Sequence, residues 1–176
     1  ALGIHGAIEF GNRLLTFVLV AVAGLTWVSA LLFRDPYRLG VRGGRRRDLR
    51  WLAGGLALGI PAQAVVGGIS VLTELNPWVV SVHLLVSMVL VGLSVWLVRL
   101  TWPLVPRRVA SALPVALVRV TFVAMVVVVW LGTVVTGSGP HAGDELAIRN
   151  GVDGGLATHV HAAAVWVTVA LKIGRA

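Results

Sequence analysis

The sequence predicts an all-α fold, a polytopic transmembrane helix bundle with five spans. Of its 176 residues, 57% are hydrophobic and only 12% are charged, whereas soluble domains carry about 25% charged residues. The mean hydropathy is +0.91, and five stretches reach or approach the length of about 20 residues that crosses a bilayer. Because the chain contains no cysteine, a disulfide scaffold and any zinc-thiolate or iron–sulfur site within these residues are excluded.

Each predicted span rests on an apolar stretch, and together they form a single transmembrane domain. The first combines an apolar stretch with a polar patch at its start, and the third begins at Asn76-Pro77, a favourable helix start because proline is tolerated in the first turn. In the second, Pro61 is expected to kink the helix and Gln63 needs an internal partner. The fifth is the shortest. The expected spans are residues 4–33, 51–71, 78–102, 113–136 and 156–173.

The basic residues gather in alternate connections. A dense arginine run at residues 45–47 follows the first span, Arg107 and Arg108 follow the third, and Lys172 and Arg175 end the fifth. The positive-inside rule makes these connections cytoplasmic, so the first span enters from the outer side. We interpret the net charge of +8 as a topology signal assisted by anionic lipid. The expected surroundings are therefore membrane lipid, with no nucleic-acid partner.

All five histidines lie towards the expected outer side of the membrane. Ionisable residues inside a membrane are costly, so each is a candidate functional residue. Two of them, His159 and His161, lie two positions apart and hence roughly 200° apart around a helix, so only one can face a given ligand. Histidines on separate helices at one depth, without thiolates, suit bis-imidazole heme iron better than zinc. The five histidines are His5, His83, His141, His159 and His161.

A polar stripe marks the outer end of the first span. His5, Glu9 and Asn12 are spaced i, i+4, i+7, which places them along one side of a helix, with Arg13 beside them. Such a stripe is expected to face the interior of the bundle. The alternative is an ion pair between Glu9 and Arg13 at the membrane edge.

Two further features also allow a purely structural interpretation. His83 can be a ligand or an imidazole hydrogen-bonded to a neighbouring helix, and the glycines at residues 67–68 can admit a flat macrocycle or a neighbouring helix. A weak recurrence favours the ligand: Val-Val-Gly-Gly at 65–68 and Val-Val-Thr-Gly at 134–137 each precede an outer connection and a span with histidine near its start. Repeats in membrane proteins tend to place ligand sites between them.

Three segments resemble the heme A synthase family. Residues 8–15, Ile-Glu-Phe-Gly-Asn-Arg-Leu-Leu, are similar to its Glu-x-x-His-Arg motif. Residues 61–68, followed by Asn76-Pro77 and His83, resemble its third and fourth helices, and residues 132–144 resemble the outer loop after its fifth helix. The resemblance covers nearly the whole chain. It implies helices two to six of an eight-helix protein built of two four-helix halves, so we expect the chain to be part of a longer protein.

The resemblance also implies a function. The family oxidises a methyl group of heme O to the formyl group of heme A for cytochrome oxidase. It therefore implies an oxidoreductase of the bacterial cell membrane, with heme O as substrate and heme b as cofactor in the C-terminal half. Heme O synthase and cytochrome oxidase assembly factors are the partners that it suggests.

The iron ligands follow from the same resemblance. His83 matches the histidine of the family's fourth helix and His161 that of its sixth, with His159 as the alternative. Asn12 stands where the motif has its own histidine, and asparagine is a poor iron ligand. We therefore hypothesise that His5, on the same stripe, replaces it.

The remaining candidate residues would act around the heme. Glu9 matches the motif glutamate and would accept protons, and Arg13 would either neutralise a propionate or hold Glu9 ionised. His141 would hydrogen-bond a propionate or be a plain loop histidine, and Gln63 is a candidate contact of the cofactor.

Two other functions are compatible with the pattern. A b-type cytochrome subunit that exchanges electrons with quinone also needs paired histidines. An ion-coupled transporter without heme would use the discontinuity at Pro61 and Gln63 together with a buried Glu9.

Overall fold

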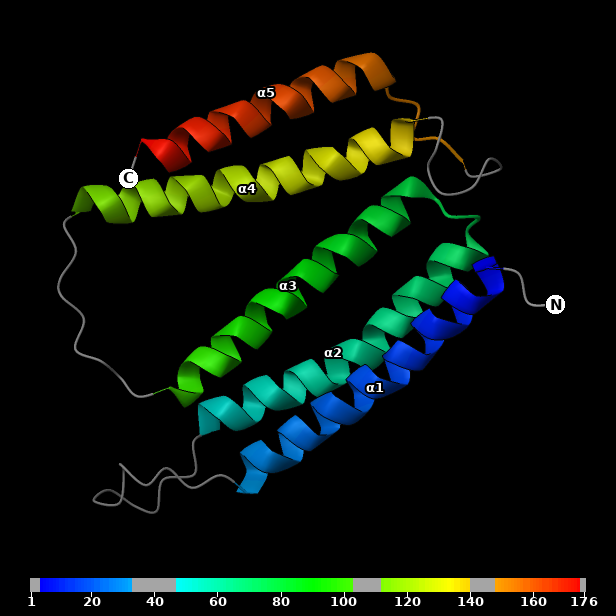
Figure 1. The fold of residues 1–176 in the computed structure, drawn as a ribbon, viewed down its shortest axis with the longest axis vertical. Helices are drawn as coiled ribbons and strands as arrows, with labels where there is room; N and C mark the ends of the chain where they lie inside the picture. The colour runs from blue at the N-terminus through cyan, green and yellow to red at the C-terminus, as the bar shows by residue number, and fades with distance from the viewer. Residues whose placement is uncertain (1–3, 33–46, 103–111, 140–147, 175–176) are drawn as a thin grey trace. The chain divides into compact units, whose positions relative to one another are not determined.

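The structure, a computed structural model, describes residues 4–32, 47–102, 112–139 and 148–174; the side chains of residues 4–9 and 12 lie outside this description. Within these ranges the chain is helical and contains no strand (Figure 1). Each helix is long and apolar enough to cross a membrane, which confirms the all-α fold with five candidate spans. The helices are α1 (Ile4–Leu32), α2 (Arg47–Leu72), α3 (Pro77–Thr101), α4 (Ala112–Ser138) and α5 (Gly154–Ile173).

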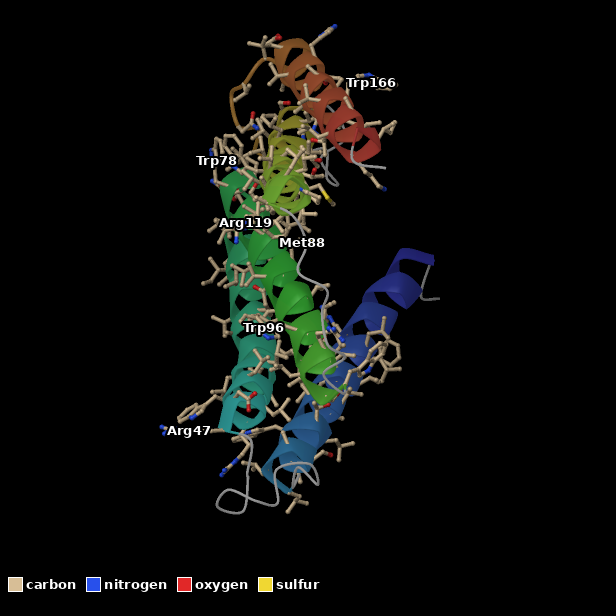
Figure 2. The ribbon with its side chains drawn as sticks, turned by 90° about the vertical axis from the view of Figure 1, so that its left-hand side faces the viewer. Arg47, Trp78, Met88, Trp96, Arg119 and Trp166 are labelled. Carbon is tan, nitrogen blue, oxygen red and sulfur yellow. The ribbon has the colours of Figure 1, made fainter. Side chains whose placement is uncertain are left out.

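The helices expose most of their large apolar side chains. Figure 2 shows side chains standing out from the ribbon, among them Trp96 and Trp166, whose exposed fractions are 59% and 72%. Soluble proteins rarely leave contiguous apolar surface of this kind open to water. Together with the helix lengths, this exposure indicates a membrane protein.

A tight turn joins α2 to α3. The backbone N–H of Leu75 donates to the carbonyl of Ser70 at 2.8 Å, and both Glu74 and Leu75 adopt left-handed φ angles of 54° and 56°. The side chain of Asn76 then accepts a hydrogen bond from the N–H of Trp78 at 3.0 Å, which caps the new helix. Pro77 occupies the first helical position, where its missing N–H costs nothing.

The described chain divides into two compact units, of which the first contains residues 1–65 and 88–103. Its small apolar core lies where α2 packs against α3 within this unit. In addition, Gly54 of α2 allows the indole ring of Trp27 on α1 to approach closely. A Cβ on Gly54 would lie 3.0 Å from Nε1 of Trp27, so only glycine allows this approach without displacement. The core residues of α2 repeat at i, i+4, i+7, as one helix face requires. The buried apolar residues are Leu49, Ala53, Leu56 and Leu97.

The second unit contains residues 66–87 and 104–176, and in it α4 packs against α5. The segment before α5 is fastened to the end of α4 by Asn150: its backbone N–H donates to the carbonyl of Gly137 at 3.0 Å, and its Nδ2 donates to the carbonyl of Val134 at 2.8 Å. Asp153 then caps α5 by accepting a hydrogen bond from the N–H of Leu156 at 2.7 Å. These bonds fix the register of α5 along α4.

Gly137 is expected to tolerate no side chain. A Cβ there would lie 2.7 Å from Cβ of Pro77 and 3.0 Å from Nδ2 of Asn150, and the proline ring cannot turn away. We expect Gly137→Ala to lower the free energy of unfolding by about 1–3 kcal/mol, the usual cost of overpacking, measured by unfolding in mixed detergent micelles. The matched control is Gly92→Ala, because a Cβ on Gly92 meets no described atom within 4 Å. Equal stability of the two variants would contradict this account.

Candidate functional site

His83 lies in the second turn of α3 and is half-buried against α2. A Cβ on Gly67 would lie 3.3 Å from Cε1 of His83 and 3.8 and 3.9 Å from its Nδ1 and Nε2. Cε1 is therefore the ring atom nearest to the bare backbone of Gly67, and the two nitrogens lie almost equally far from the ideal Cβ position. Its Nδ1 is buried. The imidazole is thus held at the α2–α3 contact within the second unit.

His161 on α5 is placed in a similar way against α4. A Cβ on Gly132 would lie 3.3 Å from Cε1 of His161 and 3.9 Å from its Nδ1, while Nε2 lies beyond 4 Å. Nδ1 is buried and has no hydrogen-bond partner in the part of the chain that the structure describes. A buried polar atom without a partner is costly. This nitrogen is therefore an unexplained polar group in an apolar helix contact.

His159 differs from His161 although it belongs to the same helix. Its side chain is exposed, and its Nδ1 lies 2.7 Å from the carbonyl oxygen of Gly155 one turn earlier on α5. As predicted, the two side chains point to opposite sides of α5: His161 faces α4, and His159 points away from it and is exposed. A local hydrogen bond fully accounts for the orientation of His159.

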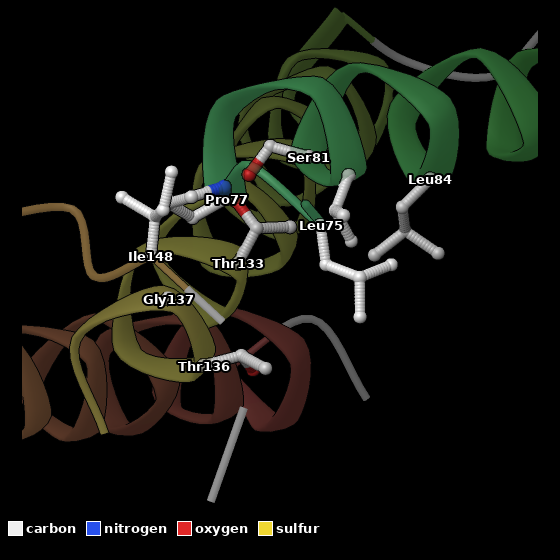
Figure 3. A pocket seen from close by; sticks show the side chains of 9 residues that line it. Leu75, Pro77, Ser81, Leu84, Thr133, Thr136, Gly137 and Ile148 are labelled. Carbon is white, nitrogen blue, oxygen red and sulfur yellow. The ribbon is translucent and has the colours of Figure 1, made fainter. Parts of the chain in front are cut away.

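A small hollow lies between the start of α3 and the end of α4 (Figure 3). Its volume is about 90 Å³. Ser81 and Thr133 contribute hydroxyl-bearing side chains that are only 5% and 9% exposed, and Oγ1 of Thr133 donates to the carbonyl of Trp130 at 2.7 Å. Ser81 was not predicted as a site residue, because it lies two positions before His83 and therefore on the opposite side of α3. The other residues around the hollow are Leu75, Pro77, Val80, Leu84, Thr136, Gly137 and Ile148.

Two further predicted site residues have described side chains. Gln63 is buried on α2, and Arg13 is exposed on α1. His5, Glu9 and Asn12 belong to α1, but their side chains lie outside the described part, as does the whole of His141. Among the described residues, no three histidine, cysteine, aspartate or glutamate side chains gather where they could hold a metal ion.

Comparison with known proteins gives the chain a family. Residues 4–170 match the family COX15-CtaA, described as Cytochrome oxidase assembly protein. The comparisons with curated proteins and with solved structures give no match. Because the family match spans nearly the whole sequence, it confirms the resemblance found from the motifs, and the chain belongs to the heme A synthase family of cytochrome oxidase assembly proteins.

Proposed function

We propose that the protein is a heme A synthase, which oxidises the methyl group of heme O to the formyl group of heme A. Membership of a cytochrome oxidase assembly family supports this reaction, because heme A serves that oxidase. The observation that carries the proposal is the difference in burial among the three described histidines. His83 and His161, which match the family's iron ligands, are half-buried against a neighbouring helix, whereas His159 is exposed.

The surroundings of His161 suit an iron ligand. Neutral imidazole is a common axial ligand of heme iron, and a ligating histidine turns its second nitrogen towards the protein. Nδ1 of His161 is buried on the side of α4 and has no hydrogen-bond partner among the described residues, and Nε2, which lies farther from Gly132, is the nitrogen that would meet the metal. We propose that His161 holds heme b, which when bound supplies one-electron redox chemistry. The hollow near Ser81, at about 90 Å³, is far smaller than the roughly 300–1,000 Å³ of ordinary ligand pockets, so we do not assign a porphyrin to it.

We propose that His83 holds heme O as the substrate. Because oxidation of a methyl group requires the ring edge to be held still, the imidazole would fix the porphyrin by its iron. Its burial against Gly67 limits how far the ring can turn. His83 would in this way orient the substrate without touching the reacting carbon.

The roles of the residues on α1 follow from the resemblance and remain proposals. Glu9 would accept protons during the oxidation, and Arg13 would neutralise a propionate or hold Glu9 ionised. His5 would replace the motif histidine that Asn12 lacks. His141 and Gln63 remain candidate contacts of the heme.

The proposed setting is the bacterial cell membrane. The histidine-bearing ends of the helices would lie on the outer side and the arginine-rich connections in the cytoplasm. Heme O synthase and cytochrome oxidase assembly factors are the proposed partners, since one makes the substrate and the others use the product.

Heme extraction tests the reaction directly. The full-length protein is produced together with heme O synthase in cells that lack heme A. The hemes bound to the purified protein are then extracted and separated by chromatography. We expect heme A and its hydroxylated precursor to accumulate beside heme O. A b-type cytochrome would yield heme b and unchanged heme O, and a transporter would yield no bound heme, so either result would contradict the proposal.

A further inference from the structure

The two histidines share one packing arrangement in separate helix pairs. In α2–α3 the Cε1 atom of His83 faces Gly67, and in α4–α5 the Cε1 atom of His161 faces Gly132. In both cases the distance from that atom to an ideal glycine Cβ is 3.3 Å. The exposed His159 has no such glycine; it bonds within its own helix. The arrangement therefore accompanies the two half-buried histidines that match the family's ligands.

A distance of 3.3 Å leaves no room for an ordinary methyl contact. Carbon atoms in contact prefer separations of about 3.5–4.0 Å, so an alanine would push the ring or the helix away by a few tenths of an ångström. Ligand geometry at metals is sensitive to displacements of that size, with about 0.5 Å as the working tolerance of a functional site. A methyl group at either glycine is thus expected to change how the imidazole meets a metal.

We propose that Gly67 and Gly132 are positioning residues, each of which sets the orientation of one heme-ligating imidazole by leaving bare backbone next to its Cε1 atom. This inference rests on the proposed function, because it takes the two histidines to bind heme iron. Neither glycine touches the heme in this proposal. Each acts only through the histidine that it faces.

The two contacts differ in direction, which makes the proposal specific. At Gly67 a Cβ would lie almost equally far from both nitrogens of His83, 3.8 and 3.9 Å, which places it over the ring face beside Cε1, so it would press on that face. At Gly132 it would lie 3.9 Å from Nδ1 of His161, with Nε2 beyond 4 Å, and so would press on the Cε1–Nδ1 side of the ring. We expect Gly132→Ala to turn the imidazole towards its Nε2 side and Gly67→Ala to tilt the imidazole out of its plane.

The test compares Gly67→Ala and Gly132→Ala with Gly55→Ala in the full-length, heme-loaded protein. Gly55 is the matched control, since it is an exposed glycine of α2 and a Cβ there meets no described atom within 4 Å. The measurements are the electron paramagnetic resonance g values of the oxidised hemes and the amount of each heme retained. Signals are assigned to the two sites with His83→Ala and His161→Ala.

We expect each glycine variant to shift the g values of one heme only, and to reduce retention of that heme about tenfold, as loss of an outer contact to a metal ligand commonly does. The Gly55→Ala protein should match the wild type. Unchanged g values in both Gly67→Ala and Gly132→Ala, or an equal shift in Gly55→Ala, would overturn the positioning role alone. A wild-type protein without heme signals would overturn the proposed function, and this inference with it.

Discussion

Replacing His83 with alanine is expected to abolish heme A formation, lowering turnover by about 100-fold or more. Loss of an outer contact to a metal ligand already costs about 10–100-fold, and here the proposed ligand itself is removed. His83 is also half-buried against Gly67, so its loss opens a gap beside the helix. The measurement is the ratio of heme A to heme O extracted from cells that produce each variant at equal level.

The rival interpretation of His83 is a purely structural imidazole that bonds to a neighbouring helix. Free imidazole distinguishes the two, because a small ligand can occupy the gap and bind iron without restoring the covalent link to α3. We expect added imidazole to restore part of the low-spin heme spectrum of His83→Ala. Full turnover in His83→Ala, or a spectrum unaffected by both the substitution and imidazole, would refute its role as a ligand.

The helices could be predicted because their signal is local. An apolar run near the length of a bilayer needs no partner in the sequence to be recognised. The helix start at Asn76-Pro77 was equally visible, and the structure confirms it through the hydrogen bond from the N–H of Trp78 to Asn76. The structure begins α2 at Arg47, ahead of the apolar run. Asp48 in its first turn favours the extension, since a carboxylate is stabilised near the positive end of a helix.

The contacts of the histidines could be predicted only in part. Two residues about 200° apart on a helix cannot both face α4, so the opposition of His159 and His161 was foreseeable. That Gly132 is the residue opposite His161 was not, because the register of α5 on α4 depends on the bonds of Asn150 to Val134 and Gly137. No periodicity in the sequence encodes such a bond. The hollow beside Ser81 escaped prediction for the same reason, since it arises where two helices meet.

The second large effect is expected at His161, and His159 supplies its control. We expect His161→Ala to lose the proposed heme b, measured as the reduced-minus-oxidised spectrum of the purified full-length protein, and to lower turnover by about 100-fold, as at His83. His159→Ala should keep both the spectrum and the turnover within about twofold, because substitutions at exposed positions usually have small effects. The two variants remove the same chemical group from the same helix.

The contrast between these variants depends on where each ring lies. Nδ1 of His159 lies 2.7 Å from the carbonyl of Gly155 on its own helix, whereas Nδ1 of His161 is buried without a partner in the described residues. An iron bound at Nε2 would give the half-buried imidazole of His161 a function, whereas the hydrogen bond to Gly155 already gives Nδ1 of His159 a partner. If His159→Ala lost the heme while His161→Ala kept it, α5 would have to present its opposite face to the cofactor. The packing of His161 against Gly132 would then serve the helix contact only.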